Sequence, residues 1–411
     1  MKKNALTVAL TKLLFNKVCT GRTFSLMFEN DAYASTCKQN ALRDKLISET
    51  KYSKRERTLH SVRMYQLTRK GVKYVLDNNE VVDGLTSLRY QLGKGLTVLA
   101  QDERSGDKKF RIARSTTAAT IANLAGADIP ADNYIIGPTN ESAANSKCIE
   151  DIIRDELVEH EYDDIQLYTV DNPEIVFHSN AAIKSILSKQ DSSNDDKDLA
   201  GGRYSGIIES PFKSAIMYVA PLFGMSWGDW AMKKDIAALH LWRKFNSATP
   251  ISYIKRSGLS AILLVTNSEQ FTNLYYNTDN AIGNDKAGFG GKYEHLYIVP
   301  ITREGAKHLH WLMTRDDEEE NLRIKERMIQ GGFYSNNEHF IKAEPFELRD
   351  QAKRRTSICF NFDAKKILSI ESAAKNHPNE QFTVLCYEWQ EPYYQRVLPS
   401  NVKIDLFEFV T

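Results

Sequence analysis

The segment KQNALRDKLISETKYSKRERTLHSVRMYQLTRKGVK, residues 38–73, carries eleven lysines and arginines and only three acidic side chains. This local excess of eight positive charges contrasts with the whole chain, whose formal net charge is +1. A basic surface concentrated in one segment of a nearly neutral chain is typical of a nucleic-acid-binding region. Ordinary solvated surfaces also carry basic runs, so the order of the predicted secondary structure has to separate the two interpretations.

The predicted order of elements around this segment is three helices, a basic β-ribbon and a further helix. Helical spacing of apolar residues predicts the first helix over Leu6–Val18 and a short second one over Phe24–Tyr33. The third is expected to begin after Ser35-Thr36, which can cap it, and to run to Ser48. Alternation over Leu59–Leu67 predicts a strand, and Thr68 is a natural N-cap for the helix that follows. This is the order of a winged helix-turn-helix.

In such a domain the third helix enters the major groove and the wing contacts phosphates. The amides of Gln39 and Asn40 can pair with adenine, and the Arg43 guanidinium can pair with guanine. The expected DNA-binding residues are therefore Thr36, Lys38, Gln39, Asn40 and Arg43 on the helix, and Lys51, Lys54, Arg55, Arg57 and Arg63 on the ribbon.

The chain of 411 residues is longer than one hydrophobic core usually supports, so several domains are expected. We expect a winged-helix domain over residues 1–80, a helical linker region over 81–150, which includes a helix at Arg111–Gly126 ended by glycine, and an α/β domain over 151–411. The fold class is thus α+β or α/β. In the last region, strands are predicted at 204–209, 215–220, 260–266, 293–300, 358–362, 382–387 and 402–409, and helices at 229–244, 268–277, 302–314 and 364–374.

Cysteine usage and hydropathy exclude several classes of protein. The five cysteines have no CxxC spacing and an odd count, which disfavours a zinc ribbon and a secreted disulfide framework. There is no run of 18 apolar residues and no signal-peptide pattern at the start of the sequence. A cytoplasmic protein without a membrane partner is expected.

The stretch Tyr65-Gln-Leu-Thr-Arg-Lys-Gly71 is similar to the YxLTxxG close of many bacterial winged-helix domains. With Arg114 to Ala125-Gly126 in a linker helix and the strands SGIIE and AILLVT later, the chain resembles proteins of Gram-positive plasmids and integrative conjugative elements related to the plasmid replication-relaxation family. The resemblance implies a C-terminal domain like a degenerate restriction endonuclease. It also implies action at an origin of replication or transfer, with replication or transfer proteins as partners.

A magnesium-dependent nuclease of that fold needs an acidic residue and an (Asp/Glu)-x-Lys triplet on the next strand. The strand at 215–220 lacks this triplet, and Glu209 and Lys213 stand at the wrong spacing for it. We therefore expect a non-catalytic scaffold without a cofactor. His308 and His310 fall on a predicted helix, where positions two apart point to different faces, so joint metal binding is not expected.

The sequence thus predicts a protein that binds double-stranded DNA through its winged helix, as a homodimer, because paired half-sites raise affinity. Two alternatives stay open. One is a nuclease or nickase that uses Mg²⁺ with Glu209, Lys213 and Asp235. The other is a transcriptional regulator whose large domain senses a ligand.

Overall fold

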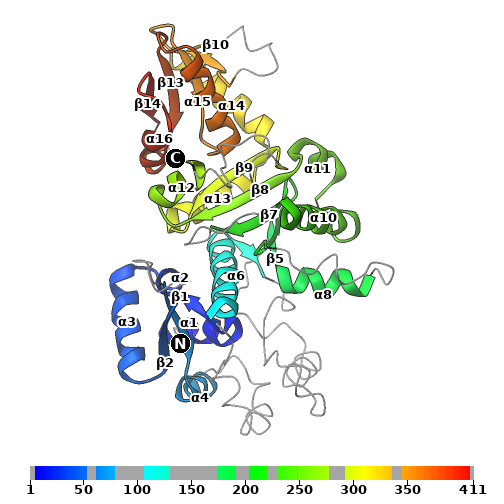
Figure 1. The fold of residues 1–411 in the computed structure, drawn as a ribbon, viewed down its shortest axis with the longest axis vertical. Helices are drawn as coiled ribbons and strands as arrows, with labels where there is room; N and C mark the ends of the chain where they lie inside the picture. Colours follow the sequence, from blue (N-terminus) through cyan, green and yellow to red (C-terminus); the bar gives the residue numbers. More distant parts are fainter. Residues whose placement is uncertain are drawn as a thin grey trace. The chain divides into compact units, whose positions relative to one another are not determined.

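The computed structural model describes residues 5–52, 62–78, 106–129, 174–190, 203–220, 229–247, 249–276, 292–335 and 345–407. The chain divides into two compact units, each of mixed α and β structure (Figure 1). The first unit comprises residues 1–173 and 177–185, and the second comprises 174–176 and 186–411. The strand β5 (Ile175–Ser179) and the helix α8 (Asn180–Gln190) cross the boundary between them.

The first unit follows a helix–strand–helix–helix–strand–strand–helix order. Its strands form a three-stranded antiparallel sheet in the order β1-β3-β2. The sheet and four helices enclose a core that includes Leu10 of α1, Phe24 of α2, Cys37 of α3, Tyr65 of β3 and Val72 of α4. The elements are α1 (Ala5–Asn16), β1 (Cys19–Thr20), α2 (Gly21–Leu26), α3 (Asp31–Arg43), β2 (Ile47–Tyr52), β3 (Val62–Leu67), α4 (Arg69–Asn78), α6 (Gly106–Leu124) and β4 (Ala127–Asp128).

The third helix begins and ends earlier than the sequence predicts. Its N-cap is Asn30, whose side chain accepts a hydrogen bond from the Tyr33 N–H at 2.7 Å, so Ser35 and Thr36 lie inside α3 and do not cap it. The predicted continuation to Ser48 was also wrong, because the chain turns at Lys45 with a positive φ of 57° and Ile47–Tyr52 forms β2. The residues from Thr36 to Arg43 therefore occupy the second half of α3.

The Thr68–Gly71 turn joins β3 to α4, and its geometry explains the residues of the YxLTxxG stretch. The Thr68 hydroxyl accepts a hydrogen bond from the Gly71 N–H at 3.1 Å, which confirms Thr68 as the cap of α4. The same hydroxyl donates to the Lys45 carbonyl at 2.5 Å. A Cβ at Gly71 would lie 1.9 Å from the carbonyl oxygen of Leu46, so only glycine lets α4 start this close to β2.

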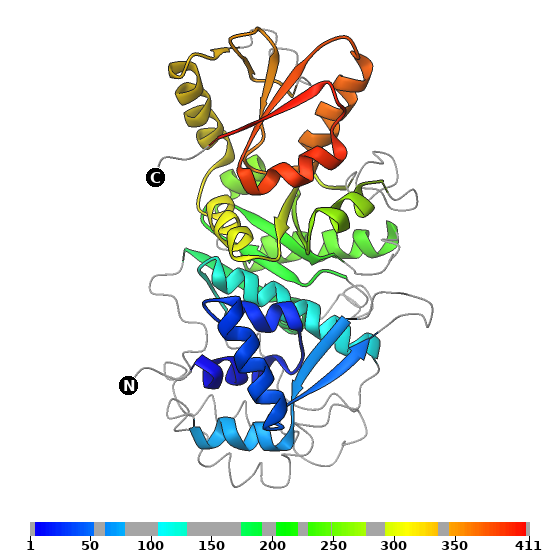
Figure 2. The ribbon, with the colours of Figure 1, turned by 90° about the vertical axis from the view of Figure 1, so that its left-hand side faces the viewer.

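The helix α6 lies against one face of the β2–β3 hairpin (Figure 2). The ring of Tyr52 stacks on Phe110 with centroids 5.2 Å apart, and Met64 packs against Phe110 and Ala113. The predicted stop by glycine is confirmed, since α6 ends at Leu124 and Gly126 has a φ of 85°. The α6 segment therefore belongs to the same compact unit as the hairpin.

The second unit contains two sheets with helices between the strands. In the first sheet β6 pairs antiparallel with β7, and β7, β8 and β9 run parallel. The other sheet has the order β10-β11-β12-β13-β14, of which the last three strands are parallel. The elements are β6 (Gly206–Glu209), β7 (Ser214–Val219), α10 (Asp229–Phe245), α11 (Ile251–Ser257), β8 (Ser260–Val265), α12 (Ser268–Tyr276), β9 (His295–Pro300), α13 (Arg303–Met313), α14 (Asp317–Gln330), β10 (Tyr334–Ser335), β11 (Leu348–Arg349), β12 (Arg355–Ile358), α15 (Ala364–Asn376), β13 (Phe382–Cys386), a 3-10 turn (Glu388–Gln390), α16 (Glu391–Val397) and β14 (Val402–Leu406).

Most elements predicted for this region are confirmed to within a few residues, but the helices α8, α11, α14 and α16 were not predicted, and α14 is the longest of them. Its N-cap is Asp316, whose side chain accepts hydrogen bonds from the Glu318 and Glu319 N–H groups. The polar and acidic sequence Ser188–Asp198 suggests an exposed loop, but its first residues belong to α8, and the rest lies outside the described residues, as do residues 53–61. Among the helices of the described ranges, none has the length and apolar character needed to cross a membrane.

Candidate nucleic-acid interface

The helix α3 presents a polar stripe to solvent. Its buried positions, Ala34, Cys37 and Ala41, repeat at a spacing of three or four residues and fix the helix against the core. On the opposite side, helical spacing places one set of exposed or half-exposed side chains along a single face. These are Tyr33, Thr36, Gln39, Asn40 and Arg43.

Arg43 at the end of this stripe is the cation best placed to reach a ligand. Its side chain is 73% exposed and lies 3.3 Å from the Asp44 carboxylate. An ion pair this exposed contributes little stability and holds the guanidinium only loosely. Lys38 differs, because its ammonium lies 5.8 Å from the centre of the Tyr65 ring, which draws it toward the hairpin and away from the stripe.

The β2–β3 hairpin carries two like charges directly opposite each other. The strand register pairs Lys51 with Arg63, and both side chains are exposed. Residues paired in this way point to the same face of the hairpin, and like charges in such a pair are destabilising. Arg63 lies 3.8 Å from Glu49, which is too long for a hydrogen bond and offsets the repulsion only in part.

This charged face of the hairpin is the one that meets α2 and α3. The pair of Glu49 and Tyr65 lies two residues along each strand, and therefore on the same face, and the centre of the Tyr65 ring lies 6.1 Å from that of Phe24 in α2. Burial, together with the Glu49 carboxylate that its hydroxyl contacts at 2.9 Å, raises the pKa of Tyr65 to about 12. The opposite face is covered by α6. Lys51 and Arg63 therefore lie on the face of the hairpin that packs against Phe24 of α2 and Lys38 of α3.

Of the predicted DNA-binding residues, Lys54, Arg55 and Arg57 lie outside the described residues. Tyr33, 45% exposed on the same stripe, was not singled out from the sequence. Tyr33 stands three residues before Thr36, so helical spacing alone would have placed it on the same face as the predicted residues.

Lys45 and Lys70 also add positive charge beyond the end of α3, where the Lys70 ammonium donates to the Asp44 carbonyl at 2.9 Å. Cations at this end complement the partial negative charge of the helix terminus.

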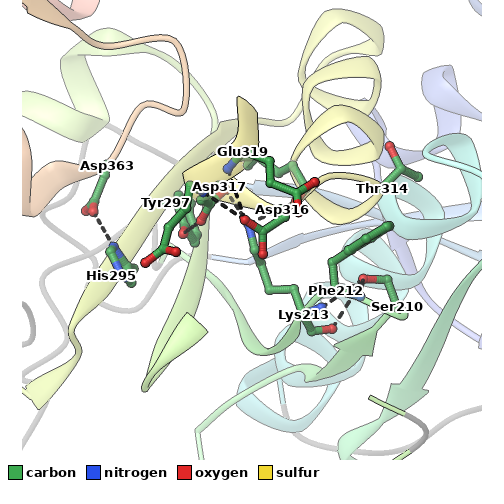
Figure 3. A network of polar contacts seen from close by, with 12 residues as sticks. Ser210, Phe212, Lys213, His295, Tyr297, Thr314, Asp316, Asp317, Glu319 and Asp363 are labelled. Carbon is green, nitrogen blue, oxygen red and sulfur yellow. Dashed lines mark hydrogen bonds and ion pairs between the residues drawn. The ribbon is translucent and has the colours of Figure 1, made fainter. Parts of the chain in front are cut away.

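The alternative catalytic residues lie in the second unit, and Lys213 is fully engaged there (Figure 3). Its ammonium donates to Asp317 at 2.8 Å and to the Leu312 carbonyl at 3.0 Å, and it lies 4.7 Å from the centre of the Tyr297 ring. Burial alone would raise the pKa of Asp317, but the Lys213 charge lowers it below its ordinary value. This lysine holds the start of α14 against β9.

Glu209 and Asp235 lie at opposite ends of β7. Glu209 pairs with Ser214, the first residue of β7. Its carboxylate is buried and accepts a hydrogen bond from the Ser247 hydroxyl at 2.5 Å. Asp235 is also buried and accepts hydrogen bonds from the Tyr218 hydroxyl at 3.0 Å and the Arg203 N–H at 2.9 Å. Ser214 and Tyr218 are about 13 Å apart along the strand. The structure therefore does not bring the two carboxylates together.

Two histidines of the second unit have shifted pKa values in opposite directions. The Nδ1 atom of His295 lies 2.9 Å from the Asp363 carboxylate. Burial alone would lower the pKa of His295, but the contact with Asp363 raises it above its ordinary value. Burial lowers the pKa of His308 to about 3, and the ring packs against Trp311 and Trp389. His310 is exposed, which confirms that His308 and His310 point to different faces of the helix.

Within the described ranges, no group of three His, Cys, Asp or Glu side chains could hold a metal ion. No protein-family model, no curated protein and no solved structure matches the chain.

Proposed function

We propose that the first unit is a winged helix that binds double-stranded DNA, with α3 in the major groove and the β2–β3 hairpin on the phosphate backbone. The order of helices and strands and the β1-β3-β2 sheet support this proposal, because a winged helix-turn-helix is expected to have this arrangement. An α-helix fits the major groove, where amide and guanidinium groups such as those of Gln39, Asn40 and Arg43 can read base edges.

The observation that carries the proposal is the exposed Lys51–Arg63 pair on the α3 side of the hairpin. A like-charge pair costs stability in the unbound protein, and a phosphate placed between the two cations would remove that cost.

The resemblance described above extends this proposal. On that basis we infer that the DNA belongs to a plasmid or conjugative element and that the second unit acts as a scaffold in replication or transfer. Glu209 and Asp235 lie at opposite ends of β7, and this separation favours a scaffold over the nuclease alternative.

The α3 assignment predicts a loss of sequence preference when its outer face is changed. We expect the variant Asn40→Ala/Arg43→Ala to lose about 30-fold or more of the discrimination between preferred and random duplexes, because each of the two base pairs read by a bidentate contact contributes about 1–3 kcal/mol. Selection from a randomised duplex library, followed by competition binding, measures this discrimination. Lys73→Ala, an exposed change on α4, is the control and should leave the preference intact. An unchanged preference in the α3 variant would exclude α3 as the reading helix.

A further inference from the structure

The strand β14 (Val402–Leu406) is the last strand of its sheet in the second unit (Figure 1). It pairs in parallel with β13 along one edge. Among the strands of the described residues, none pairs with its other edge. An open edge presents a row of backbone groups that can pair with another strand.

The hydrogen bonds to β13 show which backbone groups of β14 point outward. The Asn401 carbonyl accepts from the Phe382 N–H at 2.9 Å, and the Phe407 N–H donates to the Cys386 carbonyl at 3.0 Å. Backbone N–H and C=O groups alternate in direction along a strand. The backbone groups of residues 401, 403, 405 and 407 therefore point toward β13. The N–H groups of Ile404 and Leu406 and the carbonyls of Val402 and Ile404 therefore point to the open edge, whereas the Val402 N–H donates to Pro399 at 3.0 Å.

The side chains of β14 form a charge pattern that is complementary to itself. Lys403 and Asp405 lie on one face of the sheet, with side chains 51% and 30% exposed, and contact each other at 2.5 Å. They flank Ile404 symmetrically, one residue before it and one after it. Leu406, which is 47% exposed, lies on the other face.

We propose that β14 pairs in antiparallel fashion with β14 of a second copy of this chain, with the two Ile404 residues opposite each other. In this register the two Ile404 residues exchange both of their backbone hydrogen bonds. Each Leu406 N–H donates to the Val402 carbonyl of the other copy. Each Lys403 then stands opposite the other copy's Asp405 in a non-hydrogen-bonded pair, the kind of position in which facing side chains lie closest.

The charges favour this partner and this register over the alternatives. A lysine on an edge strand usually discourages pairing, because a like charge or an apolar strand would face it. A shift of two residues in either direction would place Lys403 opposite Lys403 or Asp405 opposite Asp405. Only the register centred on Ile404 satisfies both charges, and it closes as a two-fold dimer in which both copies use the same surface. The inference does not depend on DNA binding.

Charge-reversal variants of the full chain test the proposal by analytical ultracentrifugation over a concentration series without DNA. Lys403→Asp alone places acid opposite acid, and Asp405→Lys alone places lysine opposite lysine. Each single variant should dimerise at least about tenfold more weakly than the unmodified chain, since two favourable cross-strand pairs become repulsive. An equimolar mixture of the two variants should form a heterodimer at least as tightly as the unmodified chain, and the double variant should recover homodimerisation.

Lys307→Asp is the matched control, because it makes the same charge change at an exposed position of α13. Circular dichroism and thermal unfolding establish that each variant is folded. Equal self-association of both single variants and the unmodified chain would overturn the proposal. Absence of association both in the unmodified chain and in the mixture would overturn it as well.

Discussion

The variant Lys51→Glu/Arg63→Glu is expected to bind duplex DNA about 100- to 1,000-fold more weakly than the unmodified chain at physiological salt. Each cation that contacts a phosphate releases counterions. Loss of such a contact therefore lowers both the affinity and its dependence on salt concentration. Reversal of two charges removes two contacts and adds two repulsions. The slope of the logarithm of affinity against the logarithm of salt concentration should become shallower by about two. The loss should be similar on all DNA sequences, because phosphates carry no sequence information.

The hairpin itself should survive this change. The variant keeps a like-charge pair at the same position. Because the Arg63 side chain is 62% exposed, solvent screens both the lost contact with Glu49 and the new repulsion between the two carboxylates. Lys255→Glu/Lys307→Glu is the matched control, since it makes the same total charge change on exposed residues of the second unit. Anisotropy titrations of both variants separate a local contact from an effect of net charge. Equal losses in the two variants would refute the hairpin as a phosphate-binding element.

The second large effect is a loss of stability of the second unit in acid through His308. The ring is buried and its pKa is lowered to about 3, whereas an unfolded histidine titrates near 6.5. Between these values the unfolded chain binds one more proton than the folded chain, so stability falls as the pH falls. His308 is expected to lower the free energy of unfolding by about 1.4 kcal/mol per pH unit as the pH falls, or by about 2 kcal/mol between pH 6.5 and 5.

The groups that act electrostatically on His308 do not change this sign: Lys213 lowers its pKa further, and Asp317 and the hydrogen bond with the Asn361 backbone raise it only in part. His295 does not interfere in this window. The pKa of His295 is raised in the folded protein. Its contribution to the stability of the fold is therefore fully present below about pH 6.5 and is lost only as the pH rises through the folded pKa.

Urea unfolding followed by tryptophan fluorescence measures the acid effect on the second unit alone, because all five tryptophans lie beyond residue 186. His308→Gln should show a pH dependence that is shallower by about one proton between pH 5 and 6.5. His310→Gln, an exposed change on the same helix, should behave like the unmodified chain. If His308→Gln keeps the full pH dependence, the histidine is not held neutral in the folded protein.

The sequence predicts those elements whose pattern is local. The run Ala261–Val265 is apolar throughout and predicts a buried strand, and Thr68 marks the start of α4 through its capping group. The strand Ile47–Tyr52 was missed because its alternation is weak and its conformation depends on pairing with β3. The helix α14 had a usable signal that was not recognised, namely a capping Asp316 followed by four acidic residues in the first turn.

The candidate interface was predictable as a set of residues but not as an arrangement. The basic excess and the side chains from Thr36 to Arg43 can be read directly from the chain. That Lys51 stands opposite Arg63 on the α3 side follows only from the strand register, which has no local signature here. The packing of α6 on the other face of the hairpin is a contact between distant segments, and its covering role could not be inferred from its own helical pattern.

Binding of the full chain to a labelled duplex of mixed sequence, followed by fluorescence anisotropy across a salt series, tests whether the first unit is a DNA-binding winged helix. The full chain is required because α6 packs against the hairpin, so a fragment that ends near residue 80 would expose Met64 and Tyr52. We predict saturable binding whose affinity falls steeply and linearly on a double-logarithmic plot against salt. Absence of binding at low salt, or binding that does not respond to salt, would contradict the assignment of the first unit as a DNA-binding winged helix.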